Sequence, residues 1–175
     1  MTLQEYKKRV LDTKIYPQET DNFGRAYVTF GAIGESFELA DALISFLEST
    51  NQISDKDVIK ELGDVWWYAA TGCYEYGIKL EYKATKSTDD LNALMDLFLA
   101  NTINLAEPCK KFYRDGVNKV EPFGMYLESL YNLTGSLCEL LNTNIETIWK
   151  INVDKLHKRR LTNTLHGSGS NREDL

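Results

Sequence analysis

Four acidic residues arranged in two pairs are the strongest chemical signal in the sequence. Glu35 and Glu38 lie in GESFELAD, and Glu61 and Asp64 lie in ELGDVWWY. Within each pair the spacing is i, i+3, so on a helix both carboxylates project from one face. Two such helices packed antiparallel bring four carboxylates into a small volume, where like charges repel unless a cation neutralises them. Oxygen ligands alone favour Mg²⁺ or Mn²⁺ over zinc, so the pattern predicts a magnesium site.

The competing interpretation is a solvated acidic face, because acidic pairs at this spacing are common on exposed helices. In the helix expected at about 28–49, the face with Glu35 and Glu38 also carries apolar residues, namely Leu39, Ala42, Leu43 and Phe46. The opposite face carries the main apolar stripe, made of Phe30, Ile33, Phe37, Ala40, Ile44 and Leu47. We therefore expect this helix to be buried on both sides, where unpaired glutamates are costly. Asp41, one turn past Glu38, is either an additional ligand or a surface acid, and we favour the surface acid.

The elements that must position these acids are helices. Apolar residues recur at helical spacing in six stretches, at about 2–12, 28–49, 55–76, 89–114, 123–142 and 144–160. Ser54 with Asp57 is typical of a helix start, and Gly77 is typical of a helix end. The stripe of the helix at about 55–76 that faces the core is expected to consist of Val58, Leu62, Val65 and Ala69. Since no long run has a period of two, we predict an all-α bundle of about five to six helices.

Length and charge restrict the class of protein. A chain of 175 residues suits one domain, which we place at 1–160, followed by a polar tail containing glycine and serine at 161–175. The net charge of −6 argues against binding to nucleic-acid polymers or anionic membranes, and no apolar run reaches the roughly 20 residues that cross a bilayer. Three cysteines without CxxC spacing fit a protein of the reducing cytoplasm.

Aromatic residues follow the second acidic pair. Trp66 lies close to the apolar stripe, so we expect it in the core. Tyr68 is one turn past Asp64 on the carboxylate side, where its hydroxyl could reach a metal-bound phosphate. Trp67 points away from the core stripe and would either stack on a base or be buried in an interface. For Tyr68 and Trp67 the pattern is equally compatible with packing and with substrate binding.

Positive charge gathers towards the C-terminal end, at Lys155, His157, Lys158, Arg159 and Arg160. Cations in the last turn of a helix complement its dipole and need no other role. The functional interpretation is that some of them bind phosphate oxygens. Lys155, one turn after Asn152, is the best placed by periodicity.

With these residues in view, the sequence resembles the MazG-like all-α nucleoside triphosphate pyrophosphohydrolases. Their pattern is ExxE followed, after a spacer, by ExxD, and here Glu35-Ser-Phe-Glu38 precedes Glu61-Leu-Gly-Asp64. The flanking strings EYKKRVLDTKIYP and NVDKLHKRRLTNTLHGSGSNR are similar to the first helix and to the ending of small phage and bacterial members. The resemblance covers about half of the chain and both flanks.

One departure from the family pattern concerns the segment at about 84–143, which lies between the second acidic helix and the last helix. Compact members lack such an insertion. We expect a MazG-like four-helix core with an inserted helical hairpin, which could complete a bundle that shorter relatives, like the related dimeric dUTPases, complete by dimerising. We also expect a homodimer or a homotetramer.

The resemblance implies hydrolysis of a (deoxy)nucleoside triphosphate to the monophosphate and pyrophosphate, by attack of water at the α-phosphate. It assigns Mg²⁺, with Mn²⁺ as a substitute, to Glu35, Glu38, Glu61 and Asp64, and Glu38 doubles as the base that orients the water. The distal phosphates and the sugar would be held by Tyr68, Asn152, Lys155 and Arg159. Trp67 is a candidate for stacking on the nucleobase of the substrate.

Two other classes of function compete with this one. A ferritin-like di-iron oxidase also uses carboxylates inside a helical bundle, but it needs Glu-x-x-His motifs, and His157 and His166 belong to none. A non-catalytic module would bind a nucleotide or a protein partner and keep a vestigial metal site. The presence of all four acids favours the enzyme.

Overall fold

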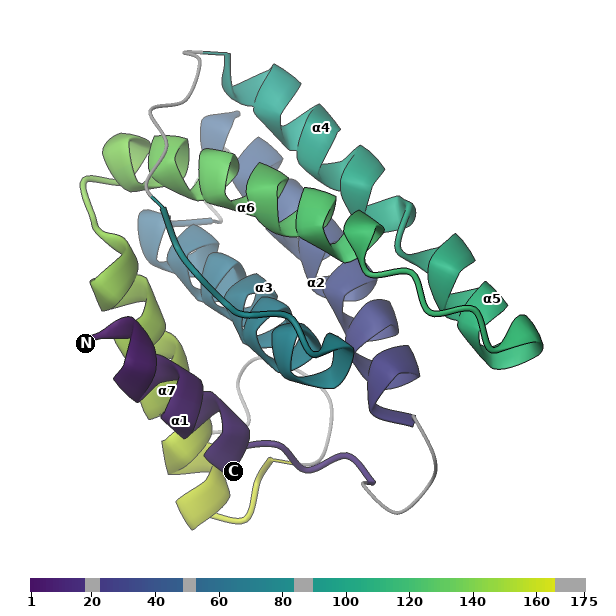
Figure 1. Ribbon diagram of the computed structural model, residues 1–175. Coiled ribbons are helices and arrows are strands. Elements are labelled where there is room, and N and C mark those ends of the chain that lie inside the picture. Colours follow the sequence, from purple (N-terminus) through teal and green to yellow (C-terminus); the bar gives the residue numbers. More distant parts are fainter. Residues whose placement is uncertain (18–22, 49–52, 84–89, 166–175) are drawn as a thin grey trace.

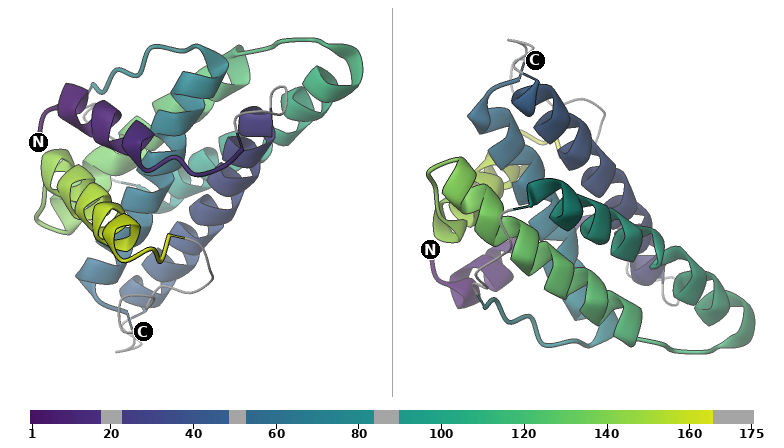
Figure 2. Two further views of the ribbon diagram at one scale, coloured as in Figure 1. Left: turned by 90° about the horizontal axis from the view of Figure 1, so that it is seen from below. Right: turned by 90° about the horizontal axis from the view of Figure 1, so that it is seen from above.

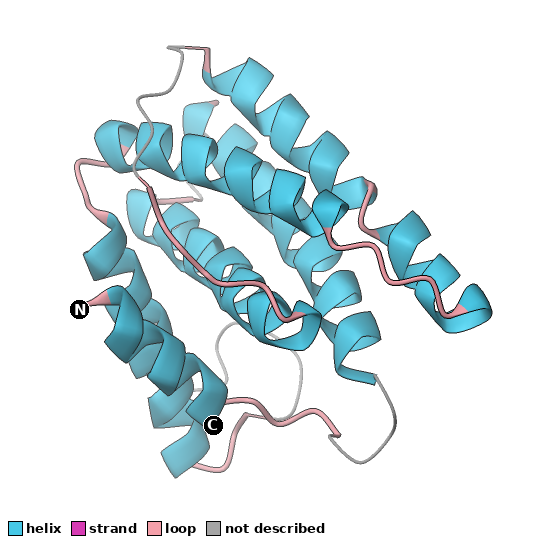
Figure 3. Cartoon of the chain, in the orientation of Figure 1, coloured by secondary structure: helices cyan, strands magenta, loops and turns pink. Residues whose placement is uncertain are grey.

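The computed structural model describes residues 1–17, 23–48, 53–83 and 90–165, and within them the chain forms helices and no strands (Figures 1 and 3). The predicted all-α fold is confirmed. Seven helices lie in the described ranges: α1 (Leu3–Asp12), α2 (Phe23–Leu47), α3 (Asp55–Tyr76), α4 (Leu91–Ile103), α5 (Ala106–Asp115), α6 (Glu121–Leu140) and α7 (Ile145–Leu161).

The helix predicted at about 89–114 is two helices, α4 and α5, because the chain breaks at Asn104 and Leu105. Pro108 explains the break. It has no N–H to donate to the carbonyl of Asn104, four residues earlier, and its ring would clash with that carbonyl. The backbone instead closes α4 with a tight turn in which the Leu105 N–H donates to the Thr102 carbonyl at 3.1 Å.

The helices α2 and α3 form an antiparallel pair at the centre of the molecule (Figure 1). The helices α1 and α7 pack against α3 on one side of this pair, and α4, α5 and α6 lie on the other side (Figure 2). The segment predicted as an insertion therefore adds a layer to a core made of α1, α2, α3 and α7. Of the predicted tail, residues 166–175 lie outside the described residues.

The start and the end of α3 are set by the residues that the sequence indicated. The Ser54 N–H donates to Asp57 Oδ2 at 2.9 Å, and the Ser54 hydroxyl donates to the same oxygen at 2.7 Å. Gly77 ends the helix with φ at 67°, in the left-handed region that favours glycine. The predicted inner stripe of α3 is confirmed, because all four of its members are fully buried: Val58, Leu62, Val65 and Ala69.

Trp66 occupies the centre of the core, as predicted. It is fully buried, and its indole N–H donates to the Thr134 hydroxyl of α6 at 3.0 Å. Its ring stacks on Tyr131 of α6, with centroids 5.6 Å apart, and meets the edge of Trp149 of α7 at 5.4 Å. One side chain of α3 thus links the layers on both sides of it.

The prediction that α2 is buried on both sides is wrong. Its face with the acidic pair packs inward, and Leu39 and Leu43 on that face are buried. The expected main stripe is instead largely exposed at Phe30, Phe37, Ile44 and Leu47. The reason is that α3 and the inserted helices contact the other faces of α2. A helix that is apolar all round does not reveal from its sequence which face the chain itself covers.

Gly72 gives a test of the packing between α3 and α6. A Cβ built at Gly72 would lie 2.2 Å from the ring of Phe123, which is fully buried and stacked on Tyr76. We expect Gly72→Ala to lower the free energy of unfolding by about 1–3 kcal/mol, measured by urea denaturation. Gly124→Ala is the control, because within the described part of the chain a Cβ there meets nothing within 4 Å, and it should leave stability equal or higher. Equal stabilities of the two variants would contradict this packing.

Among the described helices, none is both long enough and apolar enough to span a bilayer.

Candidate metal centre

Three of the predicted acids converge in the structure. Glu35 and Glu38 of α2 and Glu61 of α3 each place a carboxylate oxygen within 4.8 Å of the others. Their helices form the antiparallel central pair, so the i, i+3 spacing turns the acids of α2 towards α3. Glu35 and Glu61 are partly buried and Glu38 is exposed. The cluster therefore has an inner wall and an open side at Glu38.

Without a cation, burial and mutual repulsion raise the pKa values of two of the clustered carboxylates, Glu35 and Glu61. The pKa of Glu35 is raised from 4.5 to about 8, first by burial and then by the charges of Asp64, Glu38 and Glu61. The pKa of Glu61 is also raised, by burial and by Asp64. A divalent cation would remove this repulsion and would meet the carboxylate oxygens that hard cations prefer. The donor set fits Mg²⁺ or Mn²⁺.

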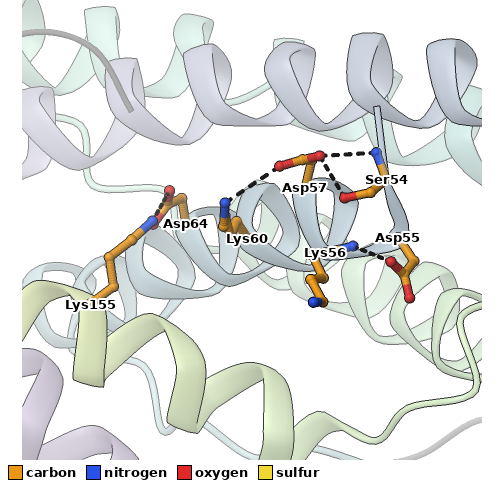
Figure 4. A network of polar contacts seen from close by, with 7 residues as sticks. All are labelled: Ser54, Asp55, Lys56, Asp57, Lys60, Asp64 and Lys155. Carbon is orange, nitrogen blue, oxygen red and sulfur yellow. Dashed lines mark hydrogen bonds and ion pairs between the residues drawn. The ribbon is translucent and has the colours of Figure 1, made fainter. Parts of the chain in front are cut away.

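Asp64, the fourth predicted acid, makes different contacts. The Asn152 side-chain amide donates to Asp64 Oδ1 at 2.7 Å. The Lys155 ammonium contacts the same oxygen at 2.7 Å (Figure 4). Both partners come from α7. Asp64 lies near enough to Glu35 to be the largest charge acting on it. The structure thus places Asp64 beside the three-carboxylate cluster, with its charge met by Lys155.

The approach of α7 to Asp64 depends on Gly63, which the sequence reasoning did not single out. A Cβ at Gly63 would lie 3.0 Å from the Cβ of Asn152. Asn152 is buried, and its Oδ1 has no hydrogen-bond partner among the described residues. The sequence did carry a signal for this contact. Gly63 lies inside a predicted helix next to the predicted ligand Asp64, and a glycine inside a helix often marks close packing.

Tyr68 lies on the carboxylate side of α3, as its spacing indicated. Its ring packs directly over Gly31 of α2, where a Cβ would lie 1.9 Å from it. Its ring centroid is 6.0 Å from that of Tyr27, which was not predicted to take part. Burial, followed by Tyr27, raises the pKa of Tyr68, with smaller contributions from Glu35 and Asp64. Tyr68 is therefore a neutral hydroxyl, able to donate a hydrogen bond, near the acids.

The structure argues against the substrate-binding role predicted for Trp67. Its side chain is only 7% exposed, and its indole N–H donates to the Thr13 hydroxyl at 2.9 Å. The physical reason is that α1 covers this part of α3, so the ring that points away from the inner stripe is buried against the first helix. Of the two alternatives for Trp67, packing is the one that the structure supports.

The remaining predicted residues lie as follows. Arg159 is buried in the last turn of α7, one turn past Lys155, and its role in substrate binding stays a prediction. Asp41 is exposed on α2, in agreement with a surface acid. The bound nucleotide, its base and the ion itself likewise remain predictions.

Comparison with known proteins finds a similar phage protein. No protein-family model matches the chain, and no solved structure matches it. The chain is 30% identical over 103 residues to the Gene 37 protein of Mycobacterium phage L5, and the match covers 55% of this chain and 90% of that protein. The name of the relative states no activity.

Proposed function

We propose that this chain, which belongs to the same family as the Gene 37 protein of Mycobacterium phage L5, hydrolyses a (deoxy)nucleoside triphosphate to the monophosphate and pyrophosphate. The observation that carries the proposal is the meeting of Glu35, Glu38 and Glu61 within 4.8 Å across two helices. A cluster that raises the pKa of its own members is a candidate functional site, because a merely structural role is better served by uncharged residues. The resemblance to MazG-like enzymes supplies the reaction.

The three clustered carboxylates would hold Mg²⁺ or Mn²⁺. When bound, the cation neutralises the phosphate chain and makes a water molecule more acidic. Glu38 is the most exposed of the three, so it faces the side from which water and substrate arrive and is the group that accepts the proton of the attacking water. The water oxygen forms a bond to the α-phosphorus, and the bond from that phosphorus to the oxygen bridging it to the β-phosphorus breaks.

The cations and hydrogen-bond donors beside the cluster would position the leaving group. The Lys155 ammonium lies against Asp64, so it brings a positive charge to the edge of an otherwise negative site. Substrate phosphates compete with Asp64 for this ammonium, and Asn152 keeps Asp64 in place when Lys155 turns away. Tyr68 offers a neutral hydroxyl to a phosphate or sugar oxygen. Phosphoryl transfer depends mainly on positioning and charge of this kind.

A non-catalytic nucleotide- or partner-binding module is the second candidate. The contact between Asp64 and Lys155 favours it, because an internal counter-ion replaces part of the charge that a metal would otherwise supply. In that case the three remaining carboxylates would be a vestigial site.

Product analysis separates the two candidates. The protein is incubated with each of the common dNTPs and NTPs and Mg²⁺, and the products are resolved by anion-exchange chromatography, with EDTA as the control. Equal amounts of monophosphate and pyrophosphate are the expected result. Diphosphate and orthophosphate would contradict attack at the α-phosphate. Nucleotide binding without any product would favour the non-catalytic module.

A further inference from the structure

A row of exposed apolar side chains runs along the outer face of α2. Phe30 is 68% exposed, Phe37 46%, Ile44 54% and Leu47 47%. The first three are spaced by seven residues, so they lie almost in line along the helix. We call these four residues the α2 seam. Single exposed apolar residues are common, but a contiguous row on one helix marks an interaction site.

The rest of the chain offers little that could cover the α2 seam, which is about 26 Å long at 1.5 Å per residue. The segments outside the described residues are 18–22, 49–52, 84–89 and 166–175, and their apolar residues are Ala84 and Leu175. Exposed acids, Glu38 and Asp41 on the same helix and Glu48 directly after its end, disfavour an anionic membrane or a nucleic acid as the cover. We therefore expect a protein surface to cover the α2 seam.

Gly34 supplies an independent sign of close contact at the α2 seam, since it lies between Phe30 and Phe37 on the exposed face. A glycine inside a helix costs about 1 kcal/mol relative to alanine. The other glycines of α2 and α3 permit packing within the chain, because a Cβ would lie 3.0 Å or less from another side chain at Gly24, Gly31, Gly63 and Gly72. A Cβ at Gly34 would meet no atom of the described residues within 4 Å. A neighbouring molecule that approaches closely would explain why this position is glycine.

We propose that the α2 seam binds the α2 seam of a second copy of this chain, with the two helices antiparallel. The seam is self-complementary, since Phe30 and Ile44 are each seven residues from Phe37. A two-fold axis at Phe37 therefore places Phe37 against its own copy and Phe30 against the Ile44 of the second copy. Such an isologous contact closes at two chains and leaves neither seam exposed.

Charge selects the antiparallel arrangement. The exposed acid Asp41 lies in the C-terminal half of α2, and the exposed acid Glu48 follows Leu47, the last residue of that helix. Parallel helices would place each of them beside its own copy, and like charges so paired repel. Antiparallel helices place them beside the half of the second helix that carries Phe30 and Gly34.

The pairing would place the second chain beside the candidate metal centre. Glu38 follows Phe37 directly and is the exposed member of the carboxylate cluster. The second copy of α2 would therefore border the open side of that cluster. The pairing itself follows from the seam and does not depend on the proposed reaction.

Analytical ultracentrifugation over a range of protein concentrations tests the pairing. We expect the wild type to dimerise and Phe37→Asp to weaken dimerisation by at least about 30-fold, because the residue lies at the centre of the interface in both chains. Leu140→Asp, at a position that is 45% exposed on α6, is the control and should dimerise like the wild type. A wild type that stays monomeric, or a dimer that Phe37→Asp does not weaken more than Leu140→Asp, would overturn the proposal.

Gly34→Ala gives a second measurement that loss of folding cannot imitate. The alanine should leave the monomer as stable or more stable, through helix propensity, and should weaken dimerisation by about tenfold through a clash at the interface. Equal or tighter dimerisation would contradict a close approach at Gly34.

Single-cysteine variants test the direction of the helices. Phe37→Cys should form a disulfide-linked dimer on mild oxidation. Phe30→Cys alone should not, since the antiparallel arrangement places it next to the Ile44 of the second chain. Efficient cross-linking of Phe30→Cys alone, or none at Phe37→Cys, would contradict the antiparallel pairing. The native cysteines Cys73 and Cys109 are buried, and the wild type serves as the reference for Cys138.

Discussion

Glu38→Gln is expected to lower kcat for nucleoside triphosphate hydrolysis by at least about 1,000-fold, measured as pyrophosphate release with Mg²⁺. Glutamine keeps the shape of the side chain but removes the charge that attracts the cation and the group that accepts the proton of the water. Each of these is worth several kcal/mol in the transition state, and about 4 kcal/mol is 1,000-fold in rate. Glu38 is exposed and its charge repels Glu35, so the melting temperature should not fall.

The matched control for Glu38→Gln is Asp41→Asn. Asp41 is an exposed acid on the same helix, three residues further along, and it lies outside the carboxylate cluster. Its loss should leave kcat within about twofold of the wild type. Asp64→Asn should also abolish turnover while the helical fold survives. Full activity of Glu38→Gln or Asp64→Asn, or an equal loss in Asp41→Asn, would refute the assignment of the site.

The second large effect is on stability as a function of pH. The folded protein holds a proton on Glu35 up to about pH 8, whereas the unfolded chain releases it near pH 4.5. Between these values the folded state binds more protons, so without divalent cations stability falls as the pH rises. Glu61 acts in the same direction. We expect the melting temperature in EDTA to fall by about 5 °C between pH 5.5 and pH 8.

Mg²⁺ should reverse this trend, because it binds the deprotonated carboxylates. Its stabilising effect, measured as the shift in melting temperature on adding MgCl₂, should therefore be larger at pH 8 than at pH 5.5. Glu35→Gln should flatten the dependence on pH in EDTA and reduce the shift with Mg²⁺. A stability that rises with pH in EDTA, together with an unchanged Glu35→Gln profile, would show that Glu35 is not held in a repulsive cluster.

The fold could be predicted well from the sequence where a local rule determines it. The start of α3 follows from Ser54 and Asp57, and its end follows from Gly77, because each residue satisfies a backbone requirement at a helix terminus. The inner stripe of α3 was also correct, since its apolar residues repeat on a single face. The break between α4 and α5 was missed, although Pro108 marks it, because the apolar periodicity continues on both sides.

The exposed face of α2 could not be predicted, because two of its faces are apolar and the covering helices come from distant parts of the chain. The same limit applies to the site. The i, i+3 spacing predicted that Glu35 and Glu38 share a face, but only the approach of α7 decides that Asp64 contacts Lys155 and Asn152. The burial of Trp67 depends in the same way on α1. Spacing predicts which side chains share a helix face, and packing between helices decides what they contact.

The most direct test of the central claim is a titration with Mn²⁺ followed by electron paramagnetic resonance, which counts the ions that the protein removes from solution. The predicted result is saturable binding to the wild type and to Asp41→Asn, weakened at least about tenfold in Glu38→Gln and in Glu61→Gln. Equal binding by all four proteins, or no binding by the wild type, would contradict a metal centre formed by the carboxylates of α2 and α3.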